Sequence, residues 1–194
     1  MAHPAKRRAT YDDYLAVPAH QTAEIINGEL HVFPRPAPRH AHAASVLGAI
    51  VLPPFMFGDD GPGGWLILHE PELQLVPREP VSPDLAGWCV ERLPALPEEA
   101  YFSLAPDWVC EVLSKSPEKL DRDEKMPLYA AHGVPHAWLV DPVKETLETY
   151  ALTNDRTWMH TATHHGAARV RVPPFEEVAI DLGRLWAPQP PRSR

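Results

Sequence analysis

The chain has 194 residues, which is long enough for one domain with a full hydrophobic core. Hydrophobic residues make up 44% and charged residues 23%, and no apolar run approaches the roughly 20 residues needed to cross a bilayer, which excludes a membrane protein. The net charge of -8 argues against a protein that coats nucleic acid through bulk electrostatics, and it leaves only a local basic groove for such contacts.

The periodicity of apolar residues predicts helices and strands in an order typical of a mixed α/β (α+β) domain. Helices are expected at 10–18, 39–56 and 123–133, and strands at 23–33 (a hairpin), 65–70, 72–76, 84–90, 107–113, 136–142, 145–152, 157–163 and 168–172.

Turn and cap residues punctuate these elements. Thr10 and Asp13 form a capping box that opens the first helix, and Asn27-Gly28 predicts the hairpin turn because both residues tolerate positive φ. Pro53-Pro54 should end or kink the second helix. Gly133 should end the third, in which Pro127 fits only if it lies in the first turn.

The chain shows no internal repeat and no low-complexity linker, so we expect a single domain over residues 1–194, with a flexible tail at about 187–194. The N-terminus is positively charged but has no apolar stretch behind it, unlike a secretory signal. Cys89 and Cys110 lie in apolar runs without metal or redox spacing and are expected to be buried free thiols, so a cytoplasmic location is expected.

Two acidic residues lie against apolar strands. Asp84 begins the strand after Ser82-Pro83, and Glu111 lies inside a later strand, 27 residues further along. If the two strands pair, both carboxylates can converge at one edge of the sheet. Like charges that close are costly unless a cation holds them, and oxygen ligands favour Mg²⁺ or Mn²⁺. At least one of the two carboxyl groups should then have a raised pKa when no metal is bound.

Lys125 lies 14 residues beyond Glu111, in the first turn of the predicted third helix. Two acids, a lysine and a hard metal ion suit phosphodiester hydrolysis, since the metal polarises the phosphate and acidifies a water that the lysine orients. Each residue also has an ordinary structural interpretation: a turn aspartate, an edge glutamate and an exposed helix lysine. Spacing alone does not decide between the two.

A series of motifs, in order along residues 20–150, resembles the Uma-type putative restriction endonuclease family of the PD-(D/E)XK nuclease superfamily. The matching positions are Glu24, Asn27-Gly28-Glu29, His42, Pro83-Asp84, Glu111-Val112-Leu113-Ser114, Asp121, Lys125, Tyr129, Gly133-Val134 and Trp138–Asp141. The resemblance implies a restriction-endonuclease-like mixed central sheet flanked by helices, with an N-terminal β-hairpin. It also implies an endonuclease that hydrolyses DNA with Mg²⁺ or Mn²⁺.

The resemblance also implies roles for individual residues. Asp84 and Glu111 match the metal-binding acids, with the Val112 carbonyl expected as a third oxygen ligand. Leu113 stands where the superfamily lysine usually stands and should pack into apolar surroundings. The missing cation is then expected from Lys125 on the following helix, because a helix fixes a catalytic group better than a loop does.

Several further positions stay open at this point. Glu24 matches an early family glutamate that could complete the metal site, and Glu29 in the same hairpin competes with it. His42 could contact phosphate or the metal, or could instead have a capping or core role. Contacts to DNA phosphates are expected from the basic residues Arg35, Arg39, Lys115, Lys119 and Arg122.

The leading hypothesis is a Mg²⁺-dependent DNA endonuclease, and the alternative is a nucleic-acid-associated binding or accessory module of the same fold whose chemistry has lapsed. A sugar or acyl hydrolase is disfavoured by the lysine and by the order of the motifs. Because duplex cleavage usually needs two active sites, a homodimer is expected, and the hairpin of residues 138–152 could supply its interface.

Overall fold

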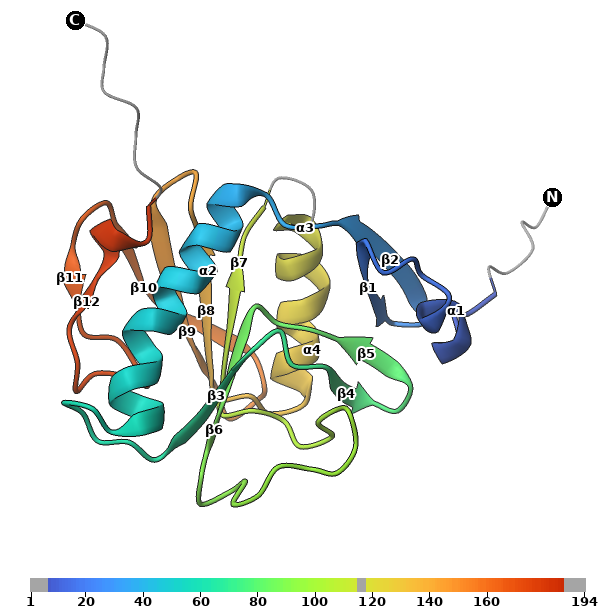
Figure 1. The fold of residues 1–194 in the computed structure, drawn as a ribbon, viewed down its shortest axis with the longest axis horizontal. Coiled ribbons are helices and arrows are strands. Elements are labelled where there is room, and N and C mark those ends of the chain that lie inside the picture. Colours follow the sequence, from blue (N-terminus) through green and yellow to red (C-terminus); the bar gives the residue numbers. More distant parts are fainter. Residues whose placement is uncertain (1–6, 115–117, 187–194) are drawn as a thin grey trace, which may run out of the picture.

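The structure is a computed structural model that describes residues 7–114 and 118–186 (Figure 1). The expectations for Lys115 and for the tail at 187–194 lie outside the described residues. The helical segments are α1 (Tyr11–Leu15), α2 (Pro38–Val51), η1 (Leu52–Phe57), α3 (Glu118–Leu120), η2 (Asp121–Lys125), α4 (Met126–Ala131) and η3 (Leu182–Arg184). The strands are β1 (Gln21–Ile26), β2 (Glu29–Pro34), β3 (Trp65–His69), β4 (Leu73–Val76), β5 (Glu79–Val81), β6 (Leu85–Cys89), β7 (Trp108–Val112), β8 (His136–Asp141), β9 (Thr146–Leu152), β10 (Trp158–His165), β11 (Arg169–Val170) and β12 (Ile180–Asp181).

A six-stranded sheet with the order β10-β9-β8-β7-β6-β3 forms the centre of the molecule. Strands β7 and β8 are parallel, and every other neighbouring pair in this sheet is antiparallel. The parallel pair requires a crossover, which the helical segment α3–η2–α4 provides. The predicted fold class, a mixed central sheet with flanking helices and an N-terminal hairpin, is confirmed.

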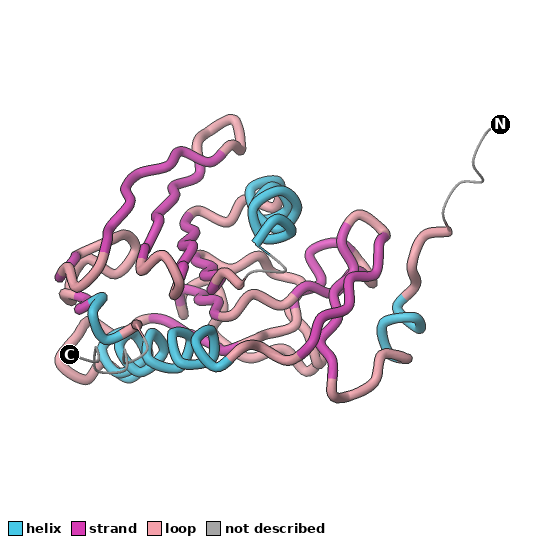
Figure 2. The backbone as a smooth tube through the Cα atoms, turned by 90° about the horizontal axis from the view of Figure 1, so that it is seen from above, coloured by secondary structure: helices cyan, strands magenta, loops and turns pink. Residues whose placement is uncertain are grey.

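The sheet lies between two helical layers, with α2 and η1 over one face and α3–η2–α4 over the other (Figure 2). Strand β7 serves both faces, because successive side chains of a strand point in opposite directions. Trp108, Cys110 and Val112 join the core under α2, whereas Val109 joins the core under α4. Glu111 therefore shares the α4 face of the sheet, although carboxylates are rarely buried.

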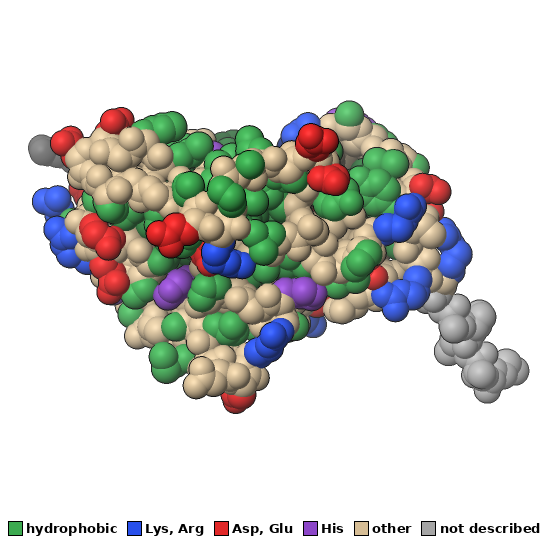
Figure 3. All heavy atoms as spheres, turned by 90° about the horizontal axis from the view of Figure 1, so that it is seen from below, with side chains coloured by type: hydrophobic (Ala, Val, Ile, Leu, Met, Phe, Trp, Pro, Cys, Tyr) green, Lys and Arg blue, Asp and Glu red, His purple; other side chains and the backbone are tan. Residues whose placement is uncertain are grey.

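An N-terminal lobe of α1, β1 and β2 lies beside the sheet (Figure 1). Asn27 and Gly28 have φ values of 54° and 78°, as the predicted hairpin turn requires, and the capping box of α1 is present. The lobe is attached through β1, which packs against β5, and through hydrogen bonds from the Tyr11 and Tyr14 hydroxyls to the Glu72 carboxylate. On the face seen from below, acidic and basic side chains are interspersed among apolar ones (Figure 3).

The helices depart from the predictions at their prolines. Pro53-Pro54 does not stop the second helix but converts it from α2 to the π-helix η1, whose wider turn accommodates the missing N–H. The third helix begins at Glu118 rather than near position 123, so Pro127 lies well inside the helical segment, where η2 passes into α4. Lys125 consequently lies in the second turn and not the first.

Segments α2 and η1 form 20 helical residues, Pro38–Phe57, with a hydropathy of 1.4, which meets the length and composition of a membrane span. The expectation that no apolar run approaches this length was wrong for this helix. In the fold it is a core helix, since Leu47, Val51 and Phe55 are buried against the sheet. Core helices of globular proteins commonly meet the same criteria.

Candidate active site

Four carboxylates and one lysine meet where the N-terminal lobe adjoins the end of β7. Glu24 comes from β1, Asp84 from the turn before β6, Glu111 from β7, and Asp121 and Lys125 from η2. Glu24, Glu111, Asp121 and Lys125 are between 2% and 7% exposed. Charged groups so deeply buried are costly unless they are paired, so the cluster is a specific feature of this fold.

Lys125 is the centre of the cluster. Its Nζ atom lies 2.9 Å from Glu24 Oε1 and 2.9 Å from Glu111 Oε1, and it donates to the carbonyl oxygen of Ser82 at 3.2 Å. Asp121 Oδ1, one helical turn before it, lies 3.9 Å away. The expected proximity of the Lys125 ammonium to Glu111 is confirmed, although its catalytic role stays a prediction. Leu113 is buried in the apolar cluster on the same face, as expected.

Glu111 and Asp84 are brought together by the pairing of β6 with β7. The register places Leu85 opposite Cys110, so Asp84 follows opposite Glu111. Asp84 Oδ2 accepts a hydrogen bond from the Val112 amide at 2.6 Å, and its Oδ1 lies 3.0 Å from His40 Nε2. Glu111 Oε1 accepts a second hydrogen bond, from the Tyr129 hydroxyl at 2.6 Å. Both carboxylates are thus held in fixed orientations.

The cluster forms the floor of a groove with a volume of ≈ 1130 Å³, between the N-terminal lobe and the first turn of α2. Glu24, Asp84, Glu111, Val112 and Lys125 all line it. The two acids predicted to form one site therefore face the same space. The remaining walls are largely apolar and rich in proline.

Burial sets the pKa values of the cluster. Removal from water raises the pKa of Glu111 well above its usual value, and the nearby Lys125 opposes this shift only in part, which confirms the expectation of one raised carboxyl pKa. Burial alone would lower the pKa of Lys125, but the Glu111 and Glu24 carboxylates outweigh it and hold that pKa well above its usual value. Lys125 is therefore a permanent cation at neutral pH.

Two further groups respond to the same environment. Burial raises the pKa of Asp121 to about 7, with Lys125 opposing the shift and Glu24 and Asp84 adding to it. Burial is the largest effect on the pKa of His40 and lowers it, but the hydrogen bond to Asp84 and the negative charges of Asp84, Asp121 and Glu70 together outweigh burial, so the pKa is raised. Four carboxylates against one lysine and one histidine leave the cluster short of positive charge.

The donor chemistry of the cluster fits a hard divalent cation. Asp84, Glu111 and Val112 line the same groove, and carboxylate and carbonyl oxygens are the ligands that Mg²⁺ and Mn²⁺ prefer. Among residues 7–114 and 118–186, however, no three His, Cys, Asp or Glu side chains are arranged to hold a metal ion. Lys125 occupies the position between Glu24 and Glu111 instead.

The structure shows which of the alternative glutamates and histidines lies in the charged cluster or the groove. Glu24, and not Glu29, joins the cluster, since Glu29 is exposed at the start of β2. His40 lines the groove in place of His42, because residues two apart on a helix point in different directions. His42 Nε2 is instead buried without a hydrogen-bond partner.

The basic residues expected to contact DNA phosphates differ in whether they line the groove. Arg35 and Arg39 line the groove. Arg122 does not, because its guanidinium forms two hydrogen bonds with the Glu148 carboxylate, at 2.9 Å and 2.6 Å. That pair fixes η2 on β9, and a contact between Arg122 and DNA phosphate stays a prediction. Lys119 is exposed on α3 and is not among the residues that line the groove.

Sequence reasoning did not place Asp121, Tyr129 or His40 in the site, although Asp121 belongs to the cluster and the other two contact it. The signal for two of them was present: Asp121 and Tyr129 lie four residues before and after Lys125, so on a helix they share its face. For His40 the sequence showed only two histidines, His40 and His42, near the start of a helix. The direction in which each side chain leaves the helix determines that His40 lines the groove.

Comparison with known proteins places this geometry in context. A family model described as "Uma2: Putative restriction endonuclease" matches residues 10–183. A solved structure of "a putative nuclease belonging to DUF820" from Anabaena variabilis ATCC 29413 superposes with a TM-score of 0.68 at 22% identity, covering 91% of this chain and 97% of that one. At that identity the likeness shows the fold alone. No curated protein matches the chain.

Proposed function

The chain belongs to the Uma2 family of putative restriction endonucleases, and from that premise we propose that it is a metal-dependent endonuclease that hydrolyses phosphodiester bonds of DNA. The family and the fold support a nuclease. The finer statements, namely metal dependence, DNA as the substrate and the roles of single residues, are the proposal.

The observation that carries the proposal is the placement of Lys125 Nζ at 2.9 Å from Glu111, on the floor of a groove that Asp84 shares. An acid from the turn before β6, an acid from β7 and a lysine within hydrogen-bond distance of the second acid form the set that phosphodiester hydrolysis needs. The lysine comes from the helix after the strand, and Leu113 fills the strand position in the apolar core.

Restriction-endonuclease-like proteins generally use a divalent cation. In this chain Asp84, Glu111 and the Val112 carbonyl would hold it, with Glu24 at the same edge. When bound, Mg²⁺ or Mn²⁺ would polarise the phosphate and lower the pKa of a water.

The residues around the proposed metal site supply positive charge and hold the two acids in place. Lys125 keeps its proton at neutral pH, so it acts as a positioned cation that steadies developing negative charge and not as a general base. The Val112 amide and His40 orient Asp84, and the Tyr129 hydroxyl orients Glu111. His40, with its raised pKa, can supply a second positive charge beside Asp84.

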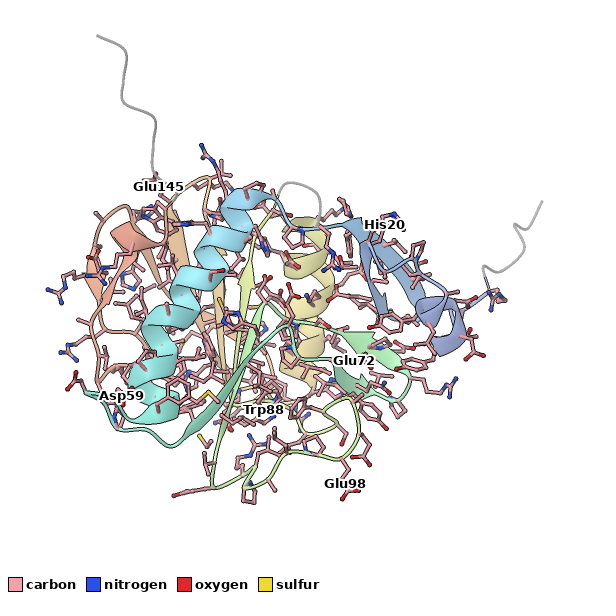
Figure 4. The ribbon with its side chains drawn as sticks, in the orientation of Figure 1. His20, Asp59, Glu72, Trp88, Glu98 and Glu145 are labelled. Carbon is pink, nitrogen blue, oxygen red and sulfur yellow. The ribbon has the colours of Figure 1, made fainter. Side chains whose placement is uncertain are left out.

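A nicking assay on supercoiled plasmid with Mg²⁺ or Mn²⁺ tests the proposal. Wild-type protein should nick the plasmid only with metal, and Glu111→Gln should lower the rate by about a hundredfold or more because a ligand oxygen is lost. Glu98→Gln is the matched control, since Glu98 is exposed on the loop at the bottom of Figure 4. Wild-type activity that survives a metal chelator would contradict metal dependence.

A second candidate, a nuclease fold without hydrolysis, is favoured by one observation. The three N–H groups of Lys125 are matched by three acceptors, on Glu24, Glu111 and Ser82, so the ammonium has little capacity left for a substrate. Under this reading the protein binds nucleic acid without cleaving it. Binding without nicking in either metal would support it.

We also propose a homodimer, which would supply two sites for duplex cleavage. The hairpin of β8 and β9 offers no free edge, because β8 pairs with β7 and β9 pairs with β10. An interface formed by a face or the turn of this hairpin stays a prediction. The free strand on that side of the sheet is β10, and sedimentation of the purified chain tests the dimer.

A further inference from the structure

The groove above the charged cluster is built differently from a cleft for duplex DNA. One wall, on the N-terminal lobe, presents the apolar side chains Leu15, Val17 and Phe33 beside several prolines. Leu15 is 63% exposed, and Val143 on the loop after β8 lines the same groove and is 56% exposed. Exposed apolar side chains gathered in a groove mark a binding surface.

The charges of the groove also disfavour a duplex. Among the described residues that line it, Arg35, Arg39 and Lys125 are the cations, against the five acids Glu24, Glu70, Asp84, Glu111 and Asp121. Duplex DNA carries two phosphate strands, about one charge per 1.7 Å of axis. Lys125 is already paired with Glu24 and Glu111, and the Arg35 guanidinium donates a hydrogen bond to the carbonyl oxygen of Ala19. Arg35 and Arg39 are then the groove cations left for phosphates, and two cations suit one nucleic-acid strand better than the two strands of a duplex.

Those cations lie at the amino end of α2, which is suited to an anion. The helix starts at Pro38 with no side-chain cap and no acidic residue in its first turn, so its first N–H groups are available. Arg39 belongs to this turn, and so does His40, whose buried Nδ1 has no hydrogen-bond partner. Phosphate oxygens would match this set of donors.

We propose that the groove holds an unpaired nucleotide strand, with phosphates at the amino end of α2 and a base against the wall of Leu15, Val17 and Phe33. Single-stranded or frayed nucleic acid is then the substrate class. In a duplex both faces of each base are covered by stacking, so only an unpaired base can contact this wall. This inference rests on the proposed function and specifies its substrate.

Fluorescence anisotropy with oligonucleotides of about 20 nucleotides tests the proposal. The arms are single-stranded DNA, single-stranded RNA and the blunt DNA duplex of the same sequence, each measured with and without Mg²⁺. Wild-type protein should bind a single strand about tenfold or more tighter than the duplex. Equal affinity for single strand and duplex would overturn the proposal.

The matched variants are Leu15→Ser and Leu96→Ser. Leu15 and Leu96 are 63% and 61% exposed, but only Leu15 lines the groove. Leu15→Ser should weaken single-strand binding by about three- to tenfold, because an apolar contact with the base is lost, while Leu96→Ser should not change it. An unchanged affinity of Leu15→Ser for single strands would overturn the proposal. A change in the oligomeric state of this variant, measured by sedimentation, would also overturn it, because the wall would then be a subunit interface.

Cleavage is measured on the same three substrates, because this distinguishes failure of the nuclease assignment from failure of the proposal that the groove holds a single strand. Cleavage of the duplex as fast as the single strand keeps the nuclease assignment and overturns the groove inference. Binding of single strands that depends on Leu15, without cleavage in either metal, overturns the nuclease assignment and upholds the groove inference. Absence of binding to every oligonucleotide overturns the groove inference.

Discussion

Lys125 shows how a buried residue couples chemistry to stability. The ammonium separates Glu24 from Glu111 and neutralises part of the charge of Asp121. A lysine that acted in catalysis alone could be replaced by Met with loss of cleavage and no change in the fold, which is the outcome that the sequence by itself predicts. Its burial at 3% exposure changes the second half of that expectation, because the variant leaves carboxylates buried without a cation.

Lys125→Met should therefore lower the free energy of unfolding by about 3–5 kcal/mol at neutral pH, in addition to abolishing activity. The loss should be smaller at about pH 5, where the carboxylates take up protons. Urea unfolding at both pH values measures it. The double variant Glu24→Gln/Lys125→Met is the control and should recover part of the loss, whereas equal stability of Lys125→Met and wild type would contradict the buried ion cluster.

Asp121 predicts a pH dependence of stability. Its folded-state pKa is raised from 3.8 to about 7, so the folded protein binds this proton more tightly than the unfolded chain does. The resulting stabilisation is full below about pH 4 and is lost as the pH rises through about 7. Asp121→Asn removes this loss and should be more stable than wild type at about pH 8, on the order of 2 kcal/mol.

Unfolding of Asp121→Asn at about pH 5 and pH 8 checks the sign, since the advantage should shrink at the lower pH. Asp123→Asn is the matched control, because Asp123 is exposed two positions along the same segment and should show no such dependence. An advantage of Asp121→Asn that does not change with pH would show that the effect is not electrostatic.

At the scale of elements, the site depends on how η2 is held against the sheet. Arg122 on η2 and Glu148 on β9 form a two-bond ion pair, and the Tyr150 hydroxyl donates to the same carboxylate. The hydrogen bonds from Arg122 are the main cause of the lowered pKa of Glu148. This pair fixes the helical segment that carries Lys125.

Glu148→Gln should cost about 1–2 kcal/mol of stability at neutral pH, because a charge-assisted pair becomes a neutral contact. The pKa of Glu148 is lower in the folded protein than in the unfolded chain. The resulting stabilisation is therefore present at pH values above the pKa of the unfolded chain, and it is lost as the pH falls through the pKa of the folded protein. The variant and wild type should therefore converge below about pH 4. Thermal unfolding across this range, with the exposed Glu177→Gln as control, measures the difference, and persistence of the gap in acid would contradict it.

At the scale of the whole molecule, the net charge of -8 restricts where nucleic acid can bind. Acidic and basic side chains are interspersed on the face of Figure 3, and the binding surface that we propose is the groove. If Arg35, Arg39 and the amino end of α2 neutralise two or three phosphates, the slope of log affinity against log salt should be about −2 for a single strand. Anisotropy titrations over a range of KCl concentrations measure it. A slope several times steeper would show that other basic residues dominate.

The sequence by itself determined the local elements whose signals are short-range. The capping box of α1, the Asn27-Gly28 hairpin and the β8–β9 hairpin were predicted because each depends on residues that are close along the chain. Asp84, Glu111 and Lys125 were also found from sequence, through their order within a family pattern. The helix boundaries were less exact, because a π-helical turn lets Pro53-Pro54 and Pro127 lie inside helical segments.

Only the tertiary structure decided which residues meet. Glu24 joins the cluster because β1 packs against β5 and places it 2.9 Å from Lys125, a contact across 101 positions of the chain that no local pattern encodes. Arg122 is withdrawn from the groove by Glu148 for the same reason. The apolar wall, too, exists only where the N-terminal lobe faces the loop after β8. Side-chain propensities act over one or two turns, whereas burial, pKa and pairing depend on distant segments that packing brings together.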